Sequence, residues 1–196
     1  MTPQPSLDEL SGLLVLVVGA SGTGKDTLLR EIERSRGSSI SVIRRFITRP
    51  VEPSEPHIPV TAEEFEAMER TGDFSLSWRA HGMCYGIGCE VNMRLALGDT
   101  CIASVSRTAI ADARRNFPKT LVVEVTVPDS VREKRLLARG REELADIQQR
   151  LQRKIEASTD ARADIVLDNS GPIEVAVETL LKVLGLCALG RRDKSA

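Results

Sequence analysis

The chain has 196 residues, of which 41% are hydrophobic and 28% are charged, and its formal net charge is -1 at pH 7. This length predicts one compact domain with inserted subdomains, and the balanced charge disfavours nucleic acid as a partner. No apolar run approaches the roughly 20 residues that cross a bilayer, and no basic segment precedes an apolar core at the N-terminus. We therefore expect a cytoplasmic protein with no membrane partner and with reduced cysteine thiols.

The first predicted strand, residues 13–18, leads through a glycine-rich loop into a helix expected at about 25–36. The strand is continuously apolar, as in a buried parallel sheet. The loop has the Gly-x-x-x-x-Gly-Lys spacing of a phosphate-binding P-loop, and the strand–loop–helix context is the one this motif requires. The residues that we expect to bind the nucleotide here are Gly19, Ala20, Ser21, Gly22, Thr23, Gly24, Lys25, Asp26 and Thr27.

The chemistry of this loop suits ATP and Mg²⁺. Glycines permit positive φ, so that backbone N–H groups converge on an anion, and Lys25 supplies a mobile charge for the β- and γ-phosphates. Asp26 departs from the motif, because Ser or Thr at this position normally offers a hydroxyl to Mg²⁺. Two interpretations stay open: Asp26 contacts Mg²⁺ directly or through water, or it only caps the helix start.

The later elements alternate between strand and helix. Residues 39–46 are expected to form a strand, 47–59 a proline-rich loop, and Thr61 and Glu64 the capped start of a helix. Helical residues 90–97 precede strands at 101–105, 121–127 and 164–168, and helices at 107–116, 128–138, 144–158 and 171–184. This order predicts an α/β fold with a parallel sheet flanked by helices and an inserted acceptor-binding region at about 47–98. The domain is expected to span 12–186, between a flexible N-terminus (1–11) and a flexible tail (187–196).

Arginines concentrate in two groups outside the predicted strands. The first comprises Arg44, Arg45, Arg49, Arg79 and Arg107, and the second comprises Arg135, Arg139, Arg141, Arg150 and Arg153. A solvated surface explains any single arginine, but a group beside a P-loop favours phosphate binding. The second group predicts an Arg-rich lid at about 136–150 that closes over the transferring phosphate; surface salt bridging with nearby glutamates is the alternative.

The chain offers no obvious catalytic base. Its two histidines, His57 and His81, both fall in the inserted region, and the sequence does not support a Ser-His-Asp catalytic triad. An alcohol acceptor would require a base such as Asp, whereas a phosphate oxygen is already ionised near neutral pH. The absence of a base therefore leans toward a phosphate acceptor.

The motifs resemble the guanylate kinase branch of the nucleoside monophosphate kinases over about residues 13–184. The segments that carry this likeness include the P-loop, Thr48-Arg49-Pro50, Gly72-Asp73-Phe74, Tyr85-Gly86 and Arg139-Gly140. The resemblance fails where guanine is read, because His57 replaces a tyrosine and Ser104 and Ser106 replace an acidic pair. A guanine edge without carboxylate partners would lose about 1–3 kcal/mol per unpaired group, so guanylate kinase activity is disfavoured.

Where the chain differs from the guanylate kinases, it resembles the ribose 1,5-bisphosphate phosphokinase family of bacterial phosphonate catabolism. The shared segments are Gly24-Lys25-Asp26, Arg45-Phe46-Ile47-Thr48-Arg49-Pro50, Glu55-Pro56-His57-Ile58, Leu76-Ser77-Trp78, Tyr85-Gly86-Ile87-Gly88 and Ser106-Arg107. The resemblance implies ATP-dependent phosphorylation of ribose 1,5-bisphosphate at its 1-phosphate, which gives 5-phosphoribosyl 1-diphosphate and ADP.

The same resemblance implies roles for individual residues. It makes Lys25, Arg139 and Arg150 catalytic, places Arg135 on the adenine, and puts Asp168-Asn169 near the base edge. The acceptor candidates are Arg45, Arg49, Tyr85 and Arg107. Two rivals remain: another P-loop small-molecule kinase, such as a guanylate-type kinase, and a non-catalytic kinase-like binding module, which the retained Lys25 disfavours. The sequence leaves open whether the protein forms a homodimer.

Overall fold

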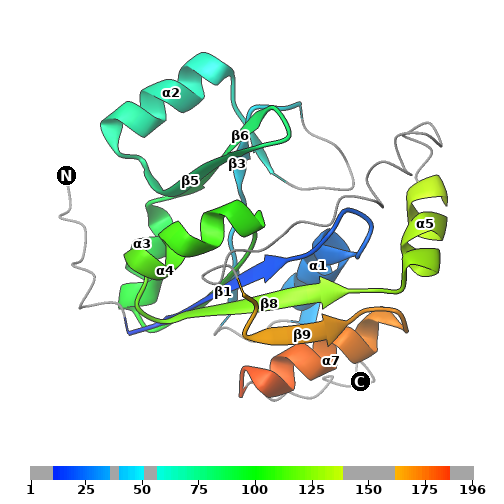
Figure 1. Ribbon diagram of the computed structural model, residues 1–196. Coiled ribbons are helices and arrows are strands. Elements are labelled where there is room, and N and C mark those ends of the chain that lie inside the picture. Colours follow the sequence, from blue (N-terminus) through cyan, green and yellow to red (C-terminus); the bar gives the residue numbers. More distant parts are fainter. Residues whose placement is uncertain (1–10, 36–39, 51–56, 139–161, 186–196) are drawn as a thin grey trace, which may run out of the picture.

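The computed structural model describes residues 11–35, 40–50, 57–138 and 162–185, and these form two β-sheets. The main sheet has five strands in the order β2-β7-β1-β8-β9, and the second sheet has four in the order β4-β3-β6-β5. Figure 1 shows the second sheet with helix α2 above the main sheet. Within the described ranges, no helix has both the length and the apolar character needed to cross a membrane.

The main sheet is parallel at every described pairing and has β1 at its centre. Its strands are β1 (Leu13–Val18), β2 (Ile40–Val42), β7 (Thr100–Ser104), β8 (Thr120–Thr126) and β9 (Ile165–Asp168). A strand buried on both faces is continuously apolar, as β1 is. The predicted parallel α/β architecture is confirmed.

Two apolar cores pack against the two faces of this sheet, and β1 contributes to both because successive side chains of a strand point to opposite faces. Leu14 and Leu16 lie in the core shared with α3 (Glu90–Ala96) and α4 (Ile110–Asn116), the latter preceded by a short 3₁₀ turn at Arg107–Ala109. Val15 and Val17 lie in the core shared with α1 (Lys25–Ser35) and α7 (Ile173–Val183). The P-loop therefore emerges from a strand whose last five residues are all buried.

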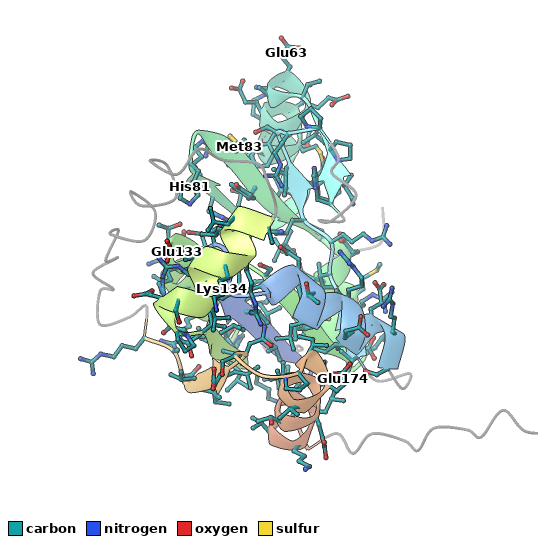
Figure 2. The ribbon with its side chains drawn as sticks, turned by 90° about the vertical axis from the view of Figure 1, so that its right-hand side faces the viewer. Glu63, His81, Met83, Glu133, Lys134 and Glu174 are labelled. Atoms are coloured by element: carbon teal, nitrogen blue, oxygen red, sulfur yellow. The ribbon has the colours of Figure 1, made fainter. Side chains whose placement is uncertain are left out.

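The second sheet is built mainly from the antiparallel hairpin of β5 (Phe74–Ala80) and β6 (Met83–Gly88). The short strands β3 (Phe46–Ile47) and β4 (Ile58–Pro59) extend it beyond β6. Helix α2 (Ala62–Thr71) packs its buried Phe65 against Phe74, with ring centroids 4.6 Å apart. Figure 2 labels Glu63 at the outer tip of α2, and His81 and Met83 at the hairpin turn.

The capping box that the sequence predicts at the start of α2 is confirmed. The Thr61 side-chain oxygen accepts from the Glu64 backbone N–H at 3.1 Å, and the Glu64 carboxylate accepts from the Thr61 N–H at 2.7 Å. This reciprocal pair satisfies two backbone donors that have no partner within the helix.

Two details of the predicted organisation are wrong. The expected single strand over 39–46 is divided between the sheets, because β2 ends at Val42 and pairs with β7, whereas Phe46 begins β3 and pairs with β6. The 47–59 segment, expected to be a loop, supplies Ile47 of β3 and the whole of β4. The insertion at about 47–98 stays a prediction, and within that segment helix α3 packs Val91 and Leu95 into the main-sheet core.

Several predicted features fall outside the described residues. These are the helix at 144–158, the lid beyond Ala138, and the segments 1–10 and 187–196. Helix α5 (Asp129–Ala138), which leads toward the predicted lid, is described and lies beyond the carboxyl end of β8 (Figure 1).

Candidate functional site

The P-loop occupies the turn between β1 and α1, as the sequence predicts. Gly22 and Gly24 have φ angles of 85° and 90°, a region that glycine adopts without the strain other residues incur. A Cβ atom on Gly22 would lie 3.0 Å from Arg132 Cγ and 3.1 Å from Leu136 Cγ, so helix α5 packs directly against the loop. Figure 2, which faces α5, labels Glu133 and Lys134 on this helix.

Lys25 extends back over its own loop. Its Nζ donates hydrogen bonds to the backbone oxygens of Gly19 at 2.8 Å and Ala20 at 3.1 Å. The Ala20 oxygen also accepts from Thr23 Oγ1 at 2.9 Å. The ammonium group is therefore held within the loop that the sequence assigns to the β- and γ-phosphates.

The Thr23 carbonyl is clamped from two distant segments. Its oxygen accepts from Asn169 Nδ2 at 2.8 Å and lies 3.4 Å from Arg135 Nη1, and Arg135 Nη2 donates to the Asn169 carbonyl at 2.9 Å. Asn169 is buried, and its Oδ1 has no hydrogen-bond partner among the residues that the structure describes. Arg135 thus supports the loop in this structure, while its expected stacking on adenine stays a prediction. We call Thr23, Arg135 and Asn169 the loop clamp.

Two residues predicted to bind the acceptor lie close together, and one of them, Arg45, lies beside the start of α1. Arg45 Nη2 is 3.5 Å from Asp26 Oδ1, and the Arg45 guanidinium lies 6.0 Å from the centre of the Tyr85 ring. Tyr85 stacks on Trp78 with centroids 5.4 Å apart. Arg45 sits in the connection between the two sheets, so it links the P-loop helix with the second sheet.

The third acceptor candidate is paired with a carboxylate that the sequence interpretation missed. Arg107 follows β7 and forms an ion pair with Glu124 of β8. Glu124 lies in register with Val18, the last residue before the P-loop. Because β1 lies between β7 and β8, this pair crosses the central strand where the loop begins. No local motif signals Glu124, since its place depends on the register of β8 against β1.

Two further arginines of the first group occupy different surroundings. The buried His57 has its Nε2 3.1 Å from the backbone oxygen of Arg49, just beyond β3. Arg79 pairs with Glu69 of α2, with Nη2 and Oε2 2.7 Å apart, and the Ser77 hydroxyl donates to the same carboxylate. The hydrogen bond from Arg79 lowers the pKa of Glu69 below its ordinary value. Arg79 thus joins α2 to β5.

The lid arginines Arg139 and Arg150, with Arg141 and Arg153, lie outside the described residues. Over the ranges that are described, no group of three or more His, Cys, Asp or Glu side chains is placed to hold a metal ion. Mg²⁺ typically keeps several waters and takes one or two carboxylates together with substrate phosphates. The residues beside the P-loop fit that kind of site, because Asp26 and Glu124 are single carboxylates on either side of it.

Several known proteins that are similar in sequence to this chain share one name. No family model matches the chain. The ribose 1,5-bisphosphate phosphokinase PhnN of Acidiphilium cryptum is 44% identical over 179 residues, which cover 90% of this chain and 94% of that protein. The proteins of the same name from Pseudomonas fluorescens and Pseudofrankia inefficax are 41% and 40% identical, each over 88% of this chain and over 94% and 90% of their own lengths.

Two solved structures share the fold. A guanylate kinase from Anaplasma phagocytophilum aligns with a TM-score of 0.66 at 16% identity, over 89% of this chain and 85% of its own. A sugar kinase from a Janibacter species aligns with a TM-score of 0.51 at 21% identity, over 89% of this chain and 95% of its own. With a guanylate kinase-like fold, a P-loop at the end of its central strand and relatives at about 40% identity over nearly their whole length, the chain belongs to the ribose 1,5-bisphosphate phosphokinase family.

Proposed function

We propose that this protein transfers the γ-phosphoryl group of ATP to the 1-phosphate of ribose 1,5-bisphosphate, producing 5-phosphoribosyl 1-diphosphate and ADP in phosphonate degradation. The observation that carries the proposal is the 44% identity, over nearly all of both chains, with a relative named for a kinase of this substrate. The P-loop geometry supports the ATP half of the reaction, and the arginines beside it support an acceptor with several negative charges.

The chemistry needs little from the protein beyond positioning and charge neutralisation. An oxygen of the 1-phosphate attacks the γ-phosphorus and forms a new P–O bond, while the bond from the γ-phosphorus to the β,γ-bridging oxygen breaks. ADP leaves with that electron pair. Because the attacking oxygen is already ionised near neutral pH, no proton has to be removed and no general base is required.

The acceptor carries roughly three to four negative charges at neutral pH. Arg45 follows β2 and Arg107 follows β7, and each lies beside one carboxylate, Asp26 and Glu124 respectively. A phosphate group offers each guanidinium a bidentate partner that competes with these pairs. We assign Arg45, Arg49, Tyr85 and Arg107 to the acceptor.

The P-loop is the main element of the proposed ATP site. Loop N–H groups and Lys25 hold the β- and γ-phosphates, Arg135 contacts the adenine, and Arg139 and Arg150 neutralise the transferring group. Mg²⁺ bound with ATP neutralises charge that develops on the phosphates, and Asp26 is the proposed protein contact for this ion.

A ³¹P NMR time course tests the function directly. Purified protein is mixed with ATP, Mg²⁺ and ribose 1,5-bisphosphate, and diphosphate resonances of the product should appear as ATP is converted to ADP. Parallel reactions with ribose 5-phosphate, GMP and gluconate measure acceptor choice through ADP release. The Lys25→Met variant controls for contaminating kinases. Turnover of only GMP or gluconate would refute the proposal.

The remaining expectations are part of the same proposal. They are a kinase domain over 12–186, with an acceptor-binding insertion and a lid at about 136–150, and a cytoplasmic location without nucleic-acid or membrane partners. Size-exclusion chromatography with light scattering decides between a monomer and a homodimer.

A further inference from the structure

The chain contains a single tryptophan, Trp78 of β5, and the proposed reaction assigns it no role. Its side chain is 6% exposed and lies in the apolar core that also contains Leu14 and Leu16 of β1. A ring of this size in a closely packed core cannot turn without moving its neighbours. Trp78 is therefore a fixed, flat surface on which another group can be held.

Tyr85 is the group that rests on this surface. The two residues lie directly opposite each other in the β5–β6 hairpin, so their side chains share one face of the second sheet. Their rings are nearly parallel, with an interplanar angle of 7° and centroids 5.4 Å apart. Tyr85 is half-buried, whereas Trp78 is buried. The tryptophan thus supports the phenol ring from the core side.

The neighbouring residues of β5 serve a different purpose on the opposite face. Side chains of a strand alternate between its two faces, and Ser77 and Arg79 both hydrogen-bond to Glu69 of α2. The second sheet therefore holds α2 on one face. Its other face carries the Trp78–Tyr85 pair and packs into the main-sheet core.

The Arg45 guanidinium lies over the Tyr85 ring, 6.0 Å from its centre, which is within the range of a cation–π contact. Its Nη2 is also 3.5 Å from Asp26 Oδ1, and the arginine side chain is only 12% exposed. Attraction between a cation and an aromatic face is stronger where water is excluded. The ring and the carboxylate together hold a long, flexible side chain that would otherwise lose rotamer freedom when a ligand binds.

We propose that Trp78 is a positioning residue of the acceptor site. By fixing the Tyr85 ring, it fixes the Arg45 guanidinium in the orientation that receives a phosphate group of the acceptor. Ordering the arginine in advance lowers the entropy cost of binding, and the tryptophan itself touches no substrate. The inference rests on the acceptor half of the proposed function, in which Arg45 and Tyr85 bind the phosphosugar.

Replacing the flat ring tests this role. Trp78→Met and Trp78→Leu both keep an apolar side chain but remove the stacking surface, and the variant that melts closer to wild type is used. Its kcat/KM for ribose 1,5-bisphosphate should fall about 2- to 10-fold, the range that a stacked aromatic pair is worth. The kcat/KM for ATP at saturating acceptor should not change. Trp78→Phe, which keeps a ring opposite Tyr85, should retain most of the acceptor kcat/KM.

The matched control is Phe117→Met. Phe117 follows α4 and is buried in the same apolar core as Trp78, so this change also replaces a core ring with a flexible apolar chain. It should lower the melting temperature and leave kcat/KM unchanged for both substrates. The control therefore separates general loss of packing in this core from loss of the surface under Tyr85.

A double-mutant cycle shows whether Trp78 acts through Arg45. Arg45→Met removes the guanidinium and keeps an unbranched side chain. In that background the same Trp78 substitution should no longer change kcat/KM for the acceptor, because the group that it positions is gone. A tryptophan that only maintains the fold would lower kcat/KM by the same factor in both backgrounds. Coupled assays of ADP release supply all the rate constants.

The outcomes separate the inference from the function on which it rests. A wild type that does not turn over ribose 1,5-bisphosphate would overturn the proposed function. If the wild type is active, the positioning role alone is overturned by an unchanged acceptor kcat/KM in the folded Trp78 variant, by an equal fall for ATP, or by an additive cycle. A Trp78→Phe variant as impaired as the aliphatic one would overturn it as well.

Discussion

Replacing Gly24 with alanine should destabilise the fold more than the backbone angle alone explains, because the loop clamp occupies the space of a side chain. Gly24 has a φ angle of 90°, and a Cβ atom there would lie 2.5 Å from Asn169 Nδ2. Real contacts of a Cβ atom are essentially never that short, so Asn169 has to move. In moving it gives up its 2.8 Å hydrogen bond to the Thr23 carbonyl.

The expected magnitude has two parts. A non-glycine residue held at positive φ costs about 1–2 kcal/mol, and loss of a buried hydrogen bond adds about 0.5–1.5 kcal/mol. We therefore expect Gly24→Ala to lower the free energy of unfolding by roughly 2–3 kcal/mol. The matched control is Gly72→Ala, because Gly72 has a φ angle of 76° and nothing within 4 Å of its Cβ position. The control isolates the first part.

Urea denaturation of five proteins measures both parts: wild type, Gly24→Ala, Gly72→Ala, Asn169→Ala and Gly24→Ala/Asn169→Ala. Truncating Asn169 removes the clash, so the second substitution should cost less in the Gly24→Ala background than in the wild type. Equal costs for Gly24→Ala and Gly72→Ala would refute the clash. An additive double-mutant cycle would show that Asn169 does not restrict Gly24.

Other perturbations test the remaining contacts. Glu124→Ala removes the partner of Arg107, and we expect a higher KM for the acceptor with an unchanged KM for ATP in steady-state assays; an equal rise in both would contradict an acceptor role. The Arg79 hydrogen bond lowers the pKa of Glu69 from 4.5, so this carboxylate stabilises the fold above pH 4.5 and the effect is lost as the pH falls through the folded pKa. In urea titrations, Arg79→Ala should therefore flatten the fall in stability below pH 4.5; a slope equal to that of wild type would contradict the pairing. Burial raises the pKa of Cys101 to about 12, so mass spectrometry should find this thiol unmodified by iodoacetamide at pH 8 until urea unfolds the chain.

The elements that local patterns specify were predicted correctly. β1 is a continuous apolar run followed by the spaced glycines and lysine of the P-loop. This combination predicts a buried strand that leads into a phosphate-binding loop, and few other structures share it. The Thr61–Glu64 capping box is equally local, since both partners lie within one turn of α2. These features need only residues near each other in sequence.

The errors arose where structure depends on distant partners. Ile40–Val42 and Phe46–Ile47 are separated by three residues but join different sheets, which only their pairings with β7 and β6 decide. β4 includes Pro59, a residue that sequence patterns exclude from strands although it is tolerated at an edge. The position of Glu124 beside the P-loop depends on the register of β8 against β1, and no local sequence motif encodes that register.

The central place of β1 also constrains the order in which the protein folds during synthesis. Its two neighbours are β7 and β8, and Leu14 pairs with Cys101 and Thr120. The chain therefore carries an apolar, strand-forming segment with open edges until more than half of it has left the ribosome. Contacts so distant in sequence form slowly, and unpaired edges invite association with other chains. The nucleotide loop takes shape only after the acceptor region has been made, so truncated chains that end before β7 should aggregate rather than bind ATP.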